Sequence, residues 1–324
     1  MNKIDLIKQP VAKELEEFRG LFEDSLTSTD PLLGEVLSYV KKRSGKMMRP
    51  ILVMLMAKLF GTLSDSTFHV ALSLELLHTA SLIHDDVVDE SDERRGQSSV
   101  NAIYNNKVSV LVGDYMLATS LKHAAHTGKV ELVELVACLG QELSEGEILQ
   151  LGNTGKEDFA EDTYFDIIRK KTAALFKASA QSGAVSANAS PEEAMKAALF
   201  GEMIGIAFQI KDDIFDYFEN TELGKPTGND MLEGKLTLPA LYVLNKLHDT
   251  SLNELALRIR ALNASKEEIA QFVETVKREG GIEYATQKMY EFREKALALL
   301  PASTDEAIRN ALTAYIDYVI ERNK

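Results

Sequence analysis

Apolar side chains recur at intervals of three and four residues through most of the 324-residue chain. This spacing places them on one side of an α-helix, whereas a half-buried strand alternates apolar and polar residues. In the segment 66–86, for example, Val70, Leu74, Leu77 and Ser81 follow one stripe. Gly and Pro do not divide the sequence into short strand-like pieces. The pattern predicts an all-α fold of about ten or more helices.

Local signals predict where several helices begin and end. Ser190 followed by Pro191 and Glu193 has the spacing of an N-cap with a capping box. Breaks are expected at 61–66, 152–162, 220–235 and 278–281. Composition is similar before and after residue 150, without a Pro/Ser-rich linker. We therefore expect residues 1–324 to form a single-domain helical bundle.

Composition and charge exclude several classes of protein. The formal net charge of −14 argues against a nucleic-acid binder, which needs a surplus of Lys and Arg. The single cysteine, Cys138, cannot form an intrachain disulfide, and its apolar surroundings predict a small core residue. The apolar runs are shorter than the roughly 18 residues that span a bilayer, and the N-terminus lacks a signal-peptide pattern. We expect a cytoplasmic protein without stable membrane insertion.

Two acidic motifs of identical spacing each follow an apolar segment directly. The first, DDVVD, begins at Asp85, and the second, DDIFD, begins at Asp212. The first and fifth residues of such a motif share one side of a helix. Clustered carboxylates repel one another unless they share a cation, and Mg²⁺ takes one or two carboxylates together with phosphate oxygens. The motifs predict a metal-dependent clamp for a diphosphate.

A set of basic and hydroxyl side chains beside Gly-containing turns fits the same anionic substrate. Each one alone carries little information, because Arg and Lys usually lie on the surface without a specific role. Their concentration in an acidic protein favours phosphate binding. The set comprises Lys46, Arg49, Arg94, Arg95, Lys171, Thr172, Lys225 and Lys235.

Three other kinds of site fit the sequence less well. Glu75-x-x-His78 is an element of di-iron carboxylate bundles, which need a second copy on another helix. The pair His84-Asp85 resembles metal-dependent phosphohydrolases, but these need more His ligands than six scattered histidines provide. The Gly-x-x-x-x-Gly-Lys-Ser/Thr spacing of a P-loop is absent.

Several motifs in order, across residues 40–240, resemble the trans-type polyprenyl diphosphate synthases, in particular long-chain, octaprenyl-like members. They are GKMMRP, HTASLIHDDVVDESDERRG, GDYM, GEILQL, the KT pair at 171–172, FQIKDDIFD and GKPTGNDMLEGKLTLP. The resemblance implies the isoprenoid synthase fold, a helical bundle with a central apolar cavity. It also implies a prenyltransferase that condenses isopentenyl diphosphate with an allylic diphosphate, such as farnesyl diphosphate, in successive head-to-tail 1'-4 steps.

The resemblance further implies a homodimer that binds three Mg²⁺ ions per active site. It also implies roles for individual residues. The implied metal ligands are Asp85, Asp86, Asp89, Asp212 and Asp216, of which the first four, with Lys171, count as catalytic. The implied ligands of the allylic diphosphate are Arg94, Lys171, Thr172, Gln209, Lys225 and Lys235. The implied ligands of isopentenyl diphosphate are Lys46, Arg49, His78 and Arg95.

The residues before the first motif bear on product length. Ser81 and Ala80 lie about one helical turn before Asp85, and Leu77 lines the next turn. In the family, a bulky aromatic residue at either of the first two places blocks the product tunnel. Because both are small, the resemblance implies a long-chain product of about C35–C50, suited to a quinone side chain. A short-chain farnesyl or geranylgeranyl diphosphate synthase is the alternative.

Two further functions fit the same residues less well. A terpene cyclase shares the ionisation chemistry but does not need the isopentenyl-binding set at Lys46, Arg49 and Arg95. A non-catalytic subunit of a larger synthase would be favoured by the loss of one aspartate motif, and both motifs are present.

Overall fold

The computed structural model describes residues 2–43, 45–94, 96–153, 159–218, 227–301 and 305–322. In these ranges all regular secondary structure is helical apart from one short hairpin, which confirms the predicted all-α class. A 3-10 turn, η1, and a π-helical turn, η2, are included. The elements are α1 (Lys3–Lys8), η1 (Gln9–Val11), α2 (Ala12–Ser25), α3 (Pro31–Lys42), α4 (Met48–Phe60), α5 (Asp65–Val88), β1 (Glu93–Arg94), β2 (Gln97–Ser98), α6 (Val100–Tyr104), α7 (Asn106–His126), α8 (Val130–Asn153), α9 (Glu161–Ile168), η2 (Arg169–Ala173), α10 (Ala174–Ser186), α11 (Pro191–Phe215), α12 (Asn229–Leu232), α13 (Leu238–Leu247), α14 (Thr250–Arg260), α15 (Lys266–Arg278), α16 (Gly281–Ala298) and α17 (Glu306–Glu321).

The chain divides into two compact units, each assembled from segments far apart in the sequence. Unit 1 consists of Met1–Gly140, Leu175–Gly201 and Leu300–Tyr315. Unit 2 consists of Gln141–Ala174, Glu202–Leu299 and Ile316–Lys324. The single domain expected for residues 1–324 stays a prediction.

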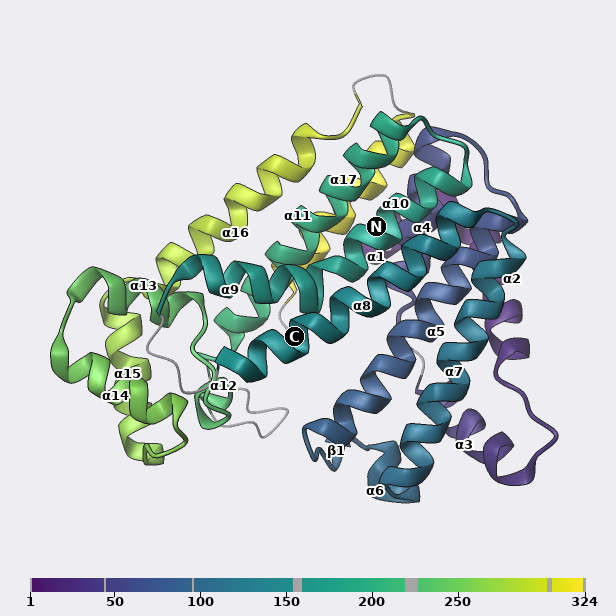
Figure 1. Ribbon diagram of the computed structural model, residues 1–324. Helices are drawn as coiled ribbons and strands as arrows, with labels where there is room; N and C mark the ends of the chain where they lie inside the picture. The colour runs from purple at the N-terminus through teal and green to yellow at the C-terminus, as the bar shows by residue number, and fades with distance from the viewer. Residues whose placement is uncertain are drawn as a thin grey trace. The chain divides into compact units, whose positions relative to one another are not determined.

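The core of unit 1 is built on α4 and α5. Every residue of α4 from Pro50 to Ala57 is buried, and a helix that is apolar on all sides belongs in an interior. The predicted stripe on α5 is buried at Val70, Leu74 and Leu77. On another side, α5 packs along α7, which runs beside it in Figure 1.

Helix α10 approaches α4 closely because position 183 has no side chain. A Cβ atom at Gly183 would lie 2.3 Å from the carbonyl oxygen of Val53 and 2.8 Å from the Cβ of Met56. These separations are shorter than van der Waals contact, so a larger residue would force the two helices apart. Glycine at this position therefore sets the spacing of two core helices.

Capping residues define the helix starts. Helix α11 begins at Pro191. The backbone N–H of Ser190 donates to the Glu193 carboxylate over 2.8 Å, and the backbone N–H of Glu193 donates to the Ser190 hydroxyl oxygen over 3.3 Å. The predicted capping box is thus confirmed. The breaks expected at 61–66 and 278–281 also lie at helix ends, after Phe60 and Arg278.

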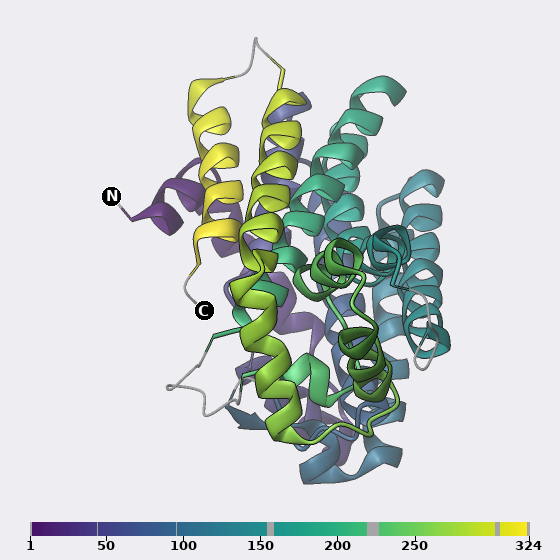
Figure 2. The same ribbon diagram turned by 90° about the vertical axis from the view of Figure 1, so that its left-hand side faces the viewer.

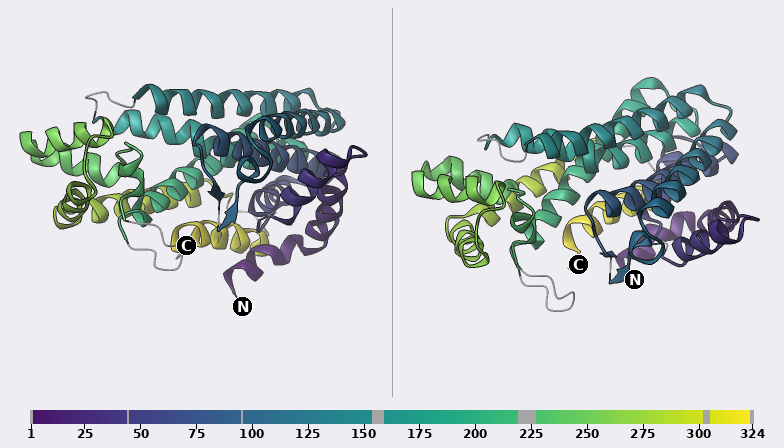
Figure 3. Two further views of the ribbon diagram at one scale, coloured as in Figure 1. Left: turned by 90° about the horizontal axis from the view of Figure 1, so that it is seen from below. Right: turned by 60° about the horizontal axis from the view of Figure 1, so that its bottom comes forward.

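A two-residue antiparallel hairpin follows α5 and was not predicted. Glu93 pairs with Ser98, and Arg94 pairs with Gln97. Figures 1 and 3 show this hairpin beyond the C-terminal end of α5. The hydroxyl of Ser99 donates to the carbonyl oxygen of Ser91 over 2.7 Å and closes the base of the loop. The hairpin fixes the position of Arg94.

Unit 2 contains a packed group of helices toward the end of the chain. Helix α13 contacts α9, α15 and α16, and α14 contacts α15. Helices α13 to α16 are the green and lime helices of Figure 2. The rings of Tyr242 and Tyr284 stack with centroids 4.1 Å apart, joining α13 to α16. The Tyr284 hydroxyl also donates to the carboxylate of Glu161 on α9 over 2.7 Å.

The prediction for the single cysteine was wrong. Cys138 is exposed, whereas Leu132, Val136 and Leu139 of the same helix, α8, are buried. With 3.6 residues per turn, position 138 falls on the side of α8 away from these three residues.

Within the described ranges, no helix has the length and apolarity required to cross a bilayer.

Candidate active site

The first aspartate motif spans the C-terminal end of α5 in unit 1. The N–H of Asp89 donates to the carbonyl oxygen of Asp85 over 2.8 Å, so the helical spacing continues through the motif. Asp85 and Asp89 therefore share one side of the helix, as predicted. Asp85 is half-buried, Asp89 is exposed and Asp86 is buried, with 2% of its surface accessible.

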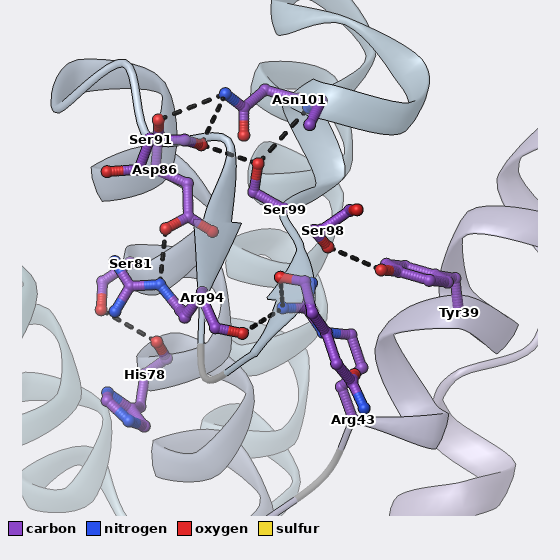
Figure 4. A network of polar contacts seen from close by, with 12 residues as sticks. Tyr39, Arg43, His78, Ser81, Asp86, Ser91, Arg94, Ser98, Ser99 and Asn101 are labelled. Atoms are coloured by element: carbon purple, nitrogen blue, oxygen red, sulfur yellow. Dashed lines mark hydrogen bonds and ion pairs between the residues drawn. The ribbon is translucent and has the colours of Figure 1, made fainter. Parts of the chain in front are cut away.

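Arg94 reaches back from the hairpin to the middle aspartate. Its Nε donates to Oδ1 of Asp86 over 2.5 Å, as Figure 4 shows. Two residues at the end of α3 hold the hairpin. Arg43, the residue after the helix, donates to the carbonyl oxygen of Arg94 over 3.0 Å, and the Tyr39 hydroxyl donates to that of Ser98 over 2.6 Å. The structure thus brings two predicted site residues, Asp86 and Arg94, into an ion pair.

The residues assigned to isopentenyl diphosphate also lie in unit 1. Lys46 is exposed, just before α4. Arg49 lies in the first turn of α4, half-buried, with its guanidinium carbon 5.6 Å from the ring centroid of Phe176. His78 is half-buried on α5. Arg95 lies outside the described residues.

The three residues assigned to product length lie on α5 before the aspartates. Ala80 is fully buried, and Leu77 has 4% of its surface accessible. Ser81 is half-buried, and its hydroxyl donates to the carbonyl oxygen of His78 over 2.9 Å, within its own helix (Figure 4). Ala80 and Ser81, the two positions assigned to blocking the product tunnel, therefore both carry small side chains.

The second aspartate motif spans the C-terminal end of α11 in unit 2. The N–H of Asp216 donates to the carbonyl oxygen of Asp212 over 3.3 Å, so these two residues again share one side of a helix. The carboxylate of Asp216 accepts from the N–H groups of Asn229 and Asp230 over 2.9 and 3.1 Å. Asp216 therefore caps the start of α12.

Arg322 forms an ion pair with the first aspartate of this motif, which the sequence analysis did not predict. Its Nη2 lies 2.5 Å from Oδ1 of Asp212. The guanidinium also stacks on the ring of Phe208, with its central carbon 3.8 Å from the ring centroid. A lone arginine in the last residues of a chain carries no sequence signal that would place it here.

The middle aspartate of the second motif is buried in a hydrogen-bond network. The Tyr164 hydroxyl donates to Oδ2 of Asp213 over 2.5 Å, and Nε2 of Gln209 donates to Oδ1 over 2.8 Å. The hydroxyl of Thr172 donates to Oε1 of Gln209 over 2.7 Å. Burial, assisted by the neighbouring charges of the motif, raises the pKa of Asp213 to about 7.

These groups line a cavity of about 210 Å³ within unit 2. Asp213 and Asp230 both line this cavity. Four residues assigned to the allylic diphosphate line it as well: Lys171, Thr172, Gln209 and Lys235. Burial, together with Asp213, raises the pKa of the Asp230 carboxyl well above its usual range. Lys225, the remaining assigned residue of unit 2, lies outside the described residues.

A π-helical turn presents the lysine of this cavity. Lys171 lies in η2, and its Nζ forms an ion pair of 2.5 Å with Glu147 of α8. A Cβ atom at Gly146 would lie 2.8 Å from the backbone nitrogen of Lys171, so glycine allows α8 to pass this close. Such π-helical turns are frequent at functional sites.

Sequence reasoning missed three residues of unit 2. Tyr164 has no motif that distinguishes it from an ordinary apolar aromatic residue. Asp230 lies inside the quoted stretch GKPTGNDMLEGK, but nothing in the sequence shows that it is buried beside Asp213. Arg322 requires the fold to bring the chain end to Asp212.

Known proteins resemble this chain over most of its length. The Polyprenyl synthetase family model matches residues 30–276. The chain belongs to the polyprenyl synthetase family. Octaprenyl diphosphate synthase of Escherichia coli (strain K12) is 32% identical over 323 residues, which cover 99% of each chain.

Two solved structures resemble this polyprenyl synthetase along its length. A geranylgeranyl pyrophosphate synthase from Bacteroides thetaiotaomicron is 52% identical with a TM-score of 0.87, covering 99% of this chain and 100% of that one. A polyprenyl synthase from Caulobacter crescentus CB15, complexed with calcium and isoprenyl diphosphate, is 30% identical with a TM-score of 0.90, covering 99% and 98%. The chain is a prenyltransferase with the isoprenoid synthase fold, and the resemblance seen in its motifs is confirmed.

Proposed function

We propose that this prenyltransferase adds isopentenyl diphosphate repeatedly to an allylic diphosphate such as farnesyl diphosphate. The product is a long-chain all-trans polyprenyl diphosphate of about C35–C50, which serves a quinone side chain. The observation that carries the proposal is the cavity of unit 2, where Lys171, Thr172, Gln209 and Lys235 gather. Ammonium, hydroxyl and amide groups that converge on one cavity suit the oxygens of a diphosphate.

Both aspartate motifs suit divalent cations. Each lies at the C-terminal end of a helix, where the helix dipole is negative and further carboxylates are unfavourable without a cation. Oxygen donors of this kind are the ligands of Mg²⁺ and Ca²⁺. When bound, such cations neutralise charge that develops on a departing diphosphate. The proposed ligands, for three Mg²⁺ ions, are Asp85, Asp86, Asp89, Asp212 and Asp216.

The five aspartates are not equally suited to bind metal. Asp85 and Asp212 are half-buried and Asp89 is exposed, so all three residues are more accessible than Asp86. Asp86 is buried and paired with Arg94, which makes it the weakest candidate of the first motif. We assign to Asp86 the additional role of positioning Arg94.

The chain's own residues supply the remaining functions of the reaction. Lys171 and Lys235 hold the allylic diphosphate as its bond to the terminal carbon breaks and charge moves onto the leaving oxygen. The double bond of isopentenyl diphosphate attacks the resulting allylic cation and forms the new carbon–carbon bond. A proton then passes to the released diphosphate, which restores the double bond. The other proposed diphosphate ligands are Lys46, Arg49, His78, Arg94, Arg95, Thr172, Gln209 and Lys225.

Product length depends on the turn before Asp85. Ala80 and Ser81 are small at the positions where a large side chain is proposed to stop the growing chain, and this supports a long product. The octaprenyl name of the Escherichia coli relative agrees with a long chain. A geranylgeranyl product is the second candidate, because it is the one named for the structure with 52% identity.

We also propose that the chain forms a homodimer. Helix α7 exposes large apolar side chains, among them Leu111 at 67% and Leu121 at 48% accessibility. Exposed apolar groups gathered on one helix suit a protein interface. A solution mass of twice 35.9 kDa is expected, and a mass of one chain would contradict it.

The reaction is tested with purified protein, Mg²⁺, farnesyl diphosphate and radiolabelled isopentenyl diphosphate. Asp85→Ala and Asp212→Ala should each lower incorporation by orders of magnitude, with circular dichroism showing an unchanged helical signal. Asp5→Ala, an exposed aspartate outside both motifs, is the matched control and should retain activity. Near-normal incorporation by either motif variant would remove that motif from the proposed metal site.

A further inference from the structure

Three histidines gather in unit 1, on a part of α5 and α7 that the proposed reaction does not use. They are His69 near the start of α5 and His123 and His126 in the last turn of α7. Positions 123 and 126 are three residues apart and share one side of their helix. One ring nitrogen from each residue lies within 4.8 Å of the other two.

The geometry is close to that of a tetrahedral metal site. Nδ1 of His69 lies 3.1 Å from Nδ1 of His123. Two ligands of a tetrahedral zinc ion, with Zn–N bonds of about 2.0–2.1 Å, are separated by about 3.3 Å. His126 is exposed, and its ring centroid lies 5.3 Å from that of His69 and 5.7 Å from that of His123.

The electrostatic surroundings suit a cation. The cluster lies at the C-terminal end of α7, where the helix dipole favours positive charge. Asp65, one turn before His69, adds a negative charge, whereas Lys122 opposes the cation. Burial, together with the other two rings, lowers the pKa of His123 to about 4, so its imidazole is neutral at pH 7.

We propose that His69, His123 and His126 bind a first-row transition-metal ion of the Zn²⁺ class. Imidazole nitrogens select Zn²⁺, Co²⁺, Ni²⁺ or Cu²⁺ over Mg²⁺, which prefers oxygen ligands. Three protein ligands leave a fourth position for water. The ion joins the start of α5 to the end of α7 and stabilises the folded chain.

This site is separate from the proposed diphosphate site. Asp85 lies 16 residues after His69 on the same helix, about 24 Å along its axis. The site can therefore be tested by metal binding alone, without substrate. A failure here would leave the proposed prenyl transfer untouched.

The test is a titration of untagged, chelator-treated protein with Zn²⁺, in excess Mg²⁺ that occupies carboxylate sites. We expect one equivalent of Zn²⁺ per chain, and Co²⁺ should show the intense visible absorption of a tetrahedral complex. His69→Asn and His126→Asn should weaken binding by more than the roughly 10–100-fold that follows loss of an outer-shell partner. His126→Asn should fold normally, because His126 is exposed.

His248→Asn is the matched control. His248 lies at the end of α13 in a left-handed conformation that asparagine tolerates. The substitution should therefore leave the Zn²⁺ affinity unchanged. Zn²⁺ should also raise the unfolding midpoint of the parent but not of His126→Asn. Equal Zn²⁺ affinity in parent, His69→Asn and His126→Asn would overturn the proposal, as would binding that excess Mg²⁺ abolishes.

Discussion

The middle aspartate of each motif is buried, whereas its neighbours in the motif are more accessible. Asp86 is paired with Arg94, and Asp213 accepts hydrogen bonds from Tyr164 and Gln209. A buried carboxylate is tolerated only when such partners satisfy it. In the proposed site, the same five-residue spacing therefore serves two functions: the outer carboxylates bind ligand, and the middle one holds the surrounding side chains in place.

Asp213 makes stability depend on pH. Its pKa is raised from 3.8 to about 7 by burial, so between these values the folded chain holds a proton that the unfolded chain has released. Its contribution to stability is therefore complete below pH 3.8 and is lost as the pH rises to about 7. In metal-free protein, Asp213→Asn should remove this loss. As the pH rises from 3.8 to about 7, the free energy of unfolding of the variant should therefore increase relative to that of the parent.

Thermal unfolding of parent and Asp213→Asn at several pH values measures this difference. Asp166→Asn, an exposed aspartate of α9, is the control and should follow the parent. Parallel curves for parent and Asp213→Asn would show that Asp213 does not titrate in this range.

If Asp212 binds a cation as proposed, the ion pair with Arg322 competes with that cation. The Arg322 guanidinium lies 2.5 Å from the carboxylate, which is 41% accessible. A partly exposed pair is worth roughly 0.5–1 kcal/mol, so Arg322→Gln should lower the Mg²⁺ concentration for half-maximal activity by about two- to fivefold.

Initial rates at graded Mg²⁺ concentrations measure this effect. Arg309→Gln, another arginine of α17 whose side chain donates to the carbonyl oxygen of Pro301, is the control. An unchanged or higher Mg²⁺ requirement in Arg322→Gln would show that the pair does not compete with the metal.

At the scale of the elements, sequence periodicity and capping predicted the helices well. The Ser190–Glu193 box and the breaks near residues 61 and 278 were confirmed because these signals are local. The hairpin at Glu93–Ser98 was missed because each of its strands has only two residues and because it is held by distant residues, Tyr39 of α3 and Arg43 directly after α3. Contacts between distant segments have no local signal.

The close approach of α10 to α4 depends on a single glycine. Gly183→Ala should lower the free energy of unfolding by about 1–3 kcal/mol, because its Cβ would overlap the Val53 carbonyl oxygen. Gly140→Ala in α8 is the control: its Cβ would meet nothing within 4 Å, and alanine should stabilise the helix by up to about 1 kcal/mol. Denaturant unfolding measures both changes. Similar effects from the two substitutions would contradict the proposed packing constraint.

At the scale of the whole molecule, family membership and reaction class followed from motifs spread along the sequence. The sequence also named four of the residues that line the unit 2 cavity, since all four lie in motifs that resemble the family: Lys171 and Thr172 in the KT pair, Gln209 in FQIKDDIFD and Lys235 in GKPTGNDMLEGKLTLP. It could not supply Tyr164, Asp230 or Arg322, whose positions depend on burial and on contacts between distant segments. Product length depends on which side chains line the path of the growing chain.

The central claim is that repeated addition of isopentenyl diphosphate continues past twenty carbons because Ala80 and Ser81 are small. The most direct test is chromatography of radiolabelled products from the parent, Ala80→Phe and Ser81→Phe, with farnesyl diphosphate as primer. We expect the parent to end at about C35–C50 and each phenylalanine variant to end at a shorter product. A parent product of twenty carbons, or variants that match the parent, would contradict the claim.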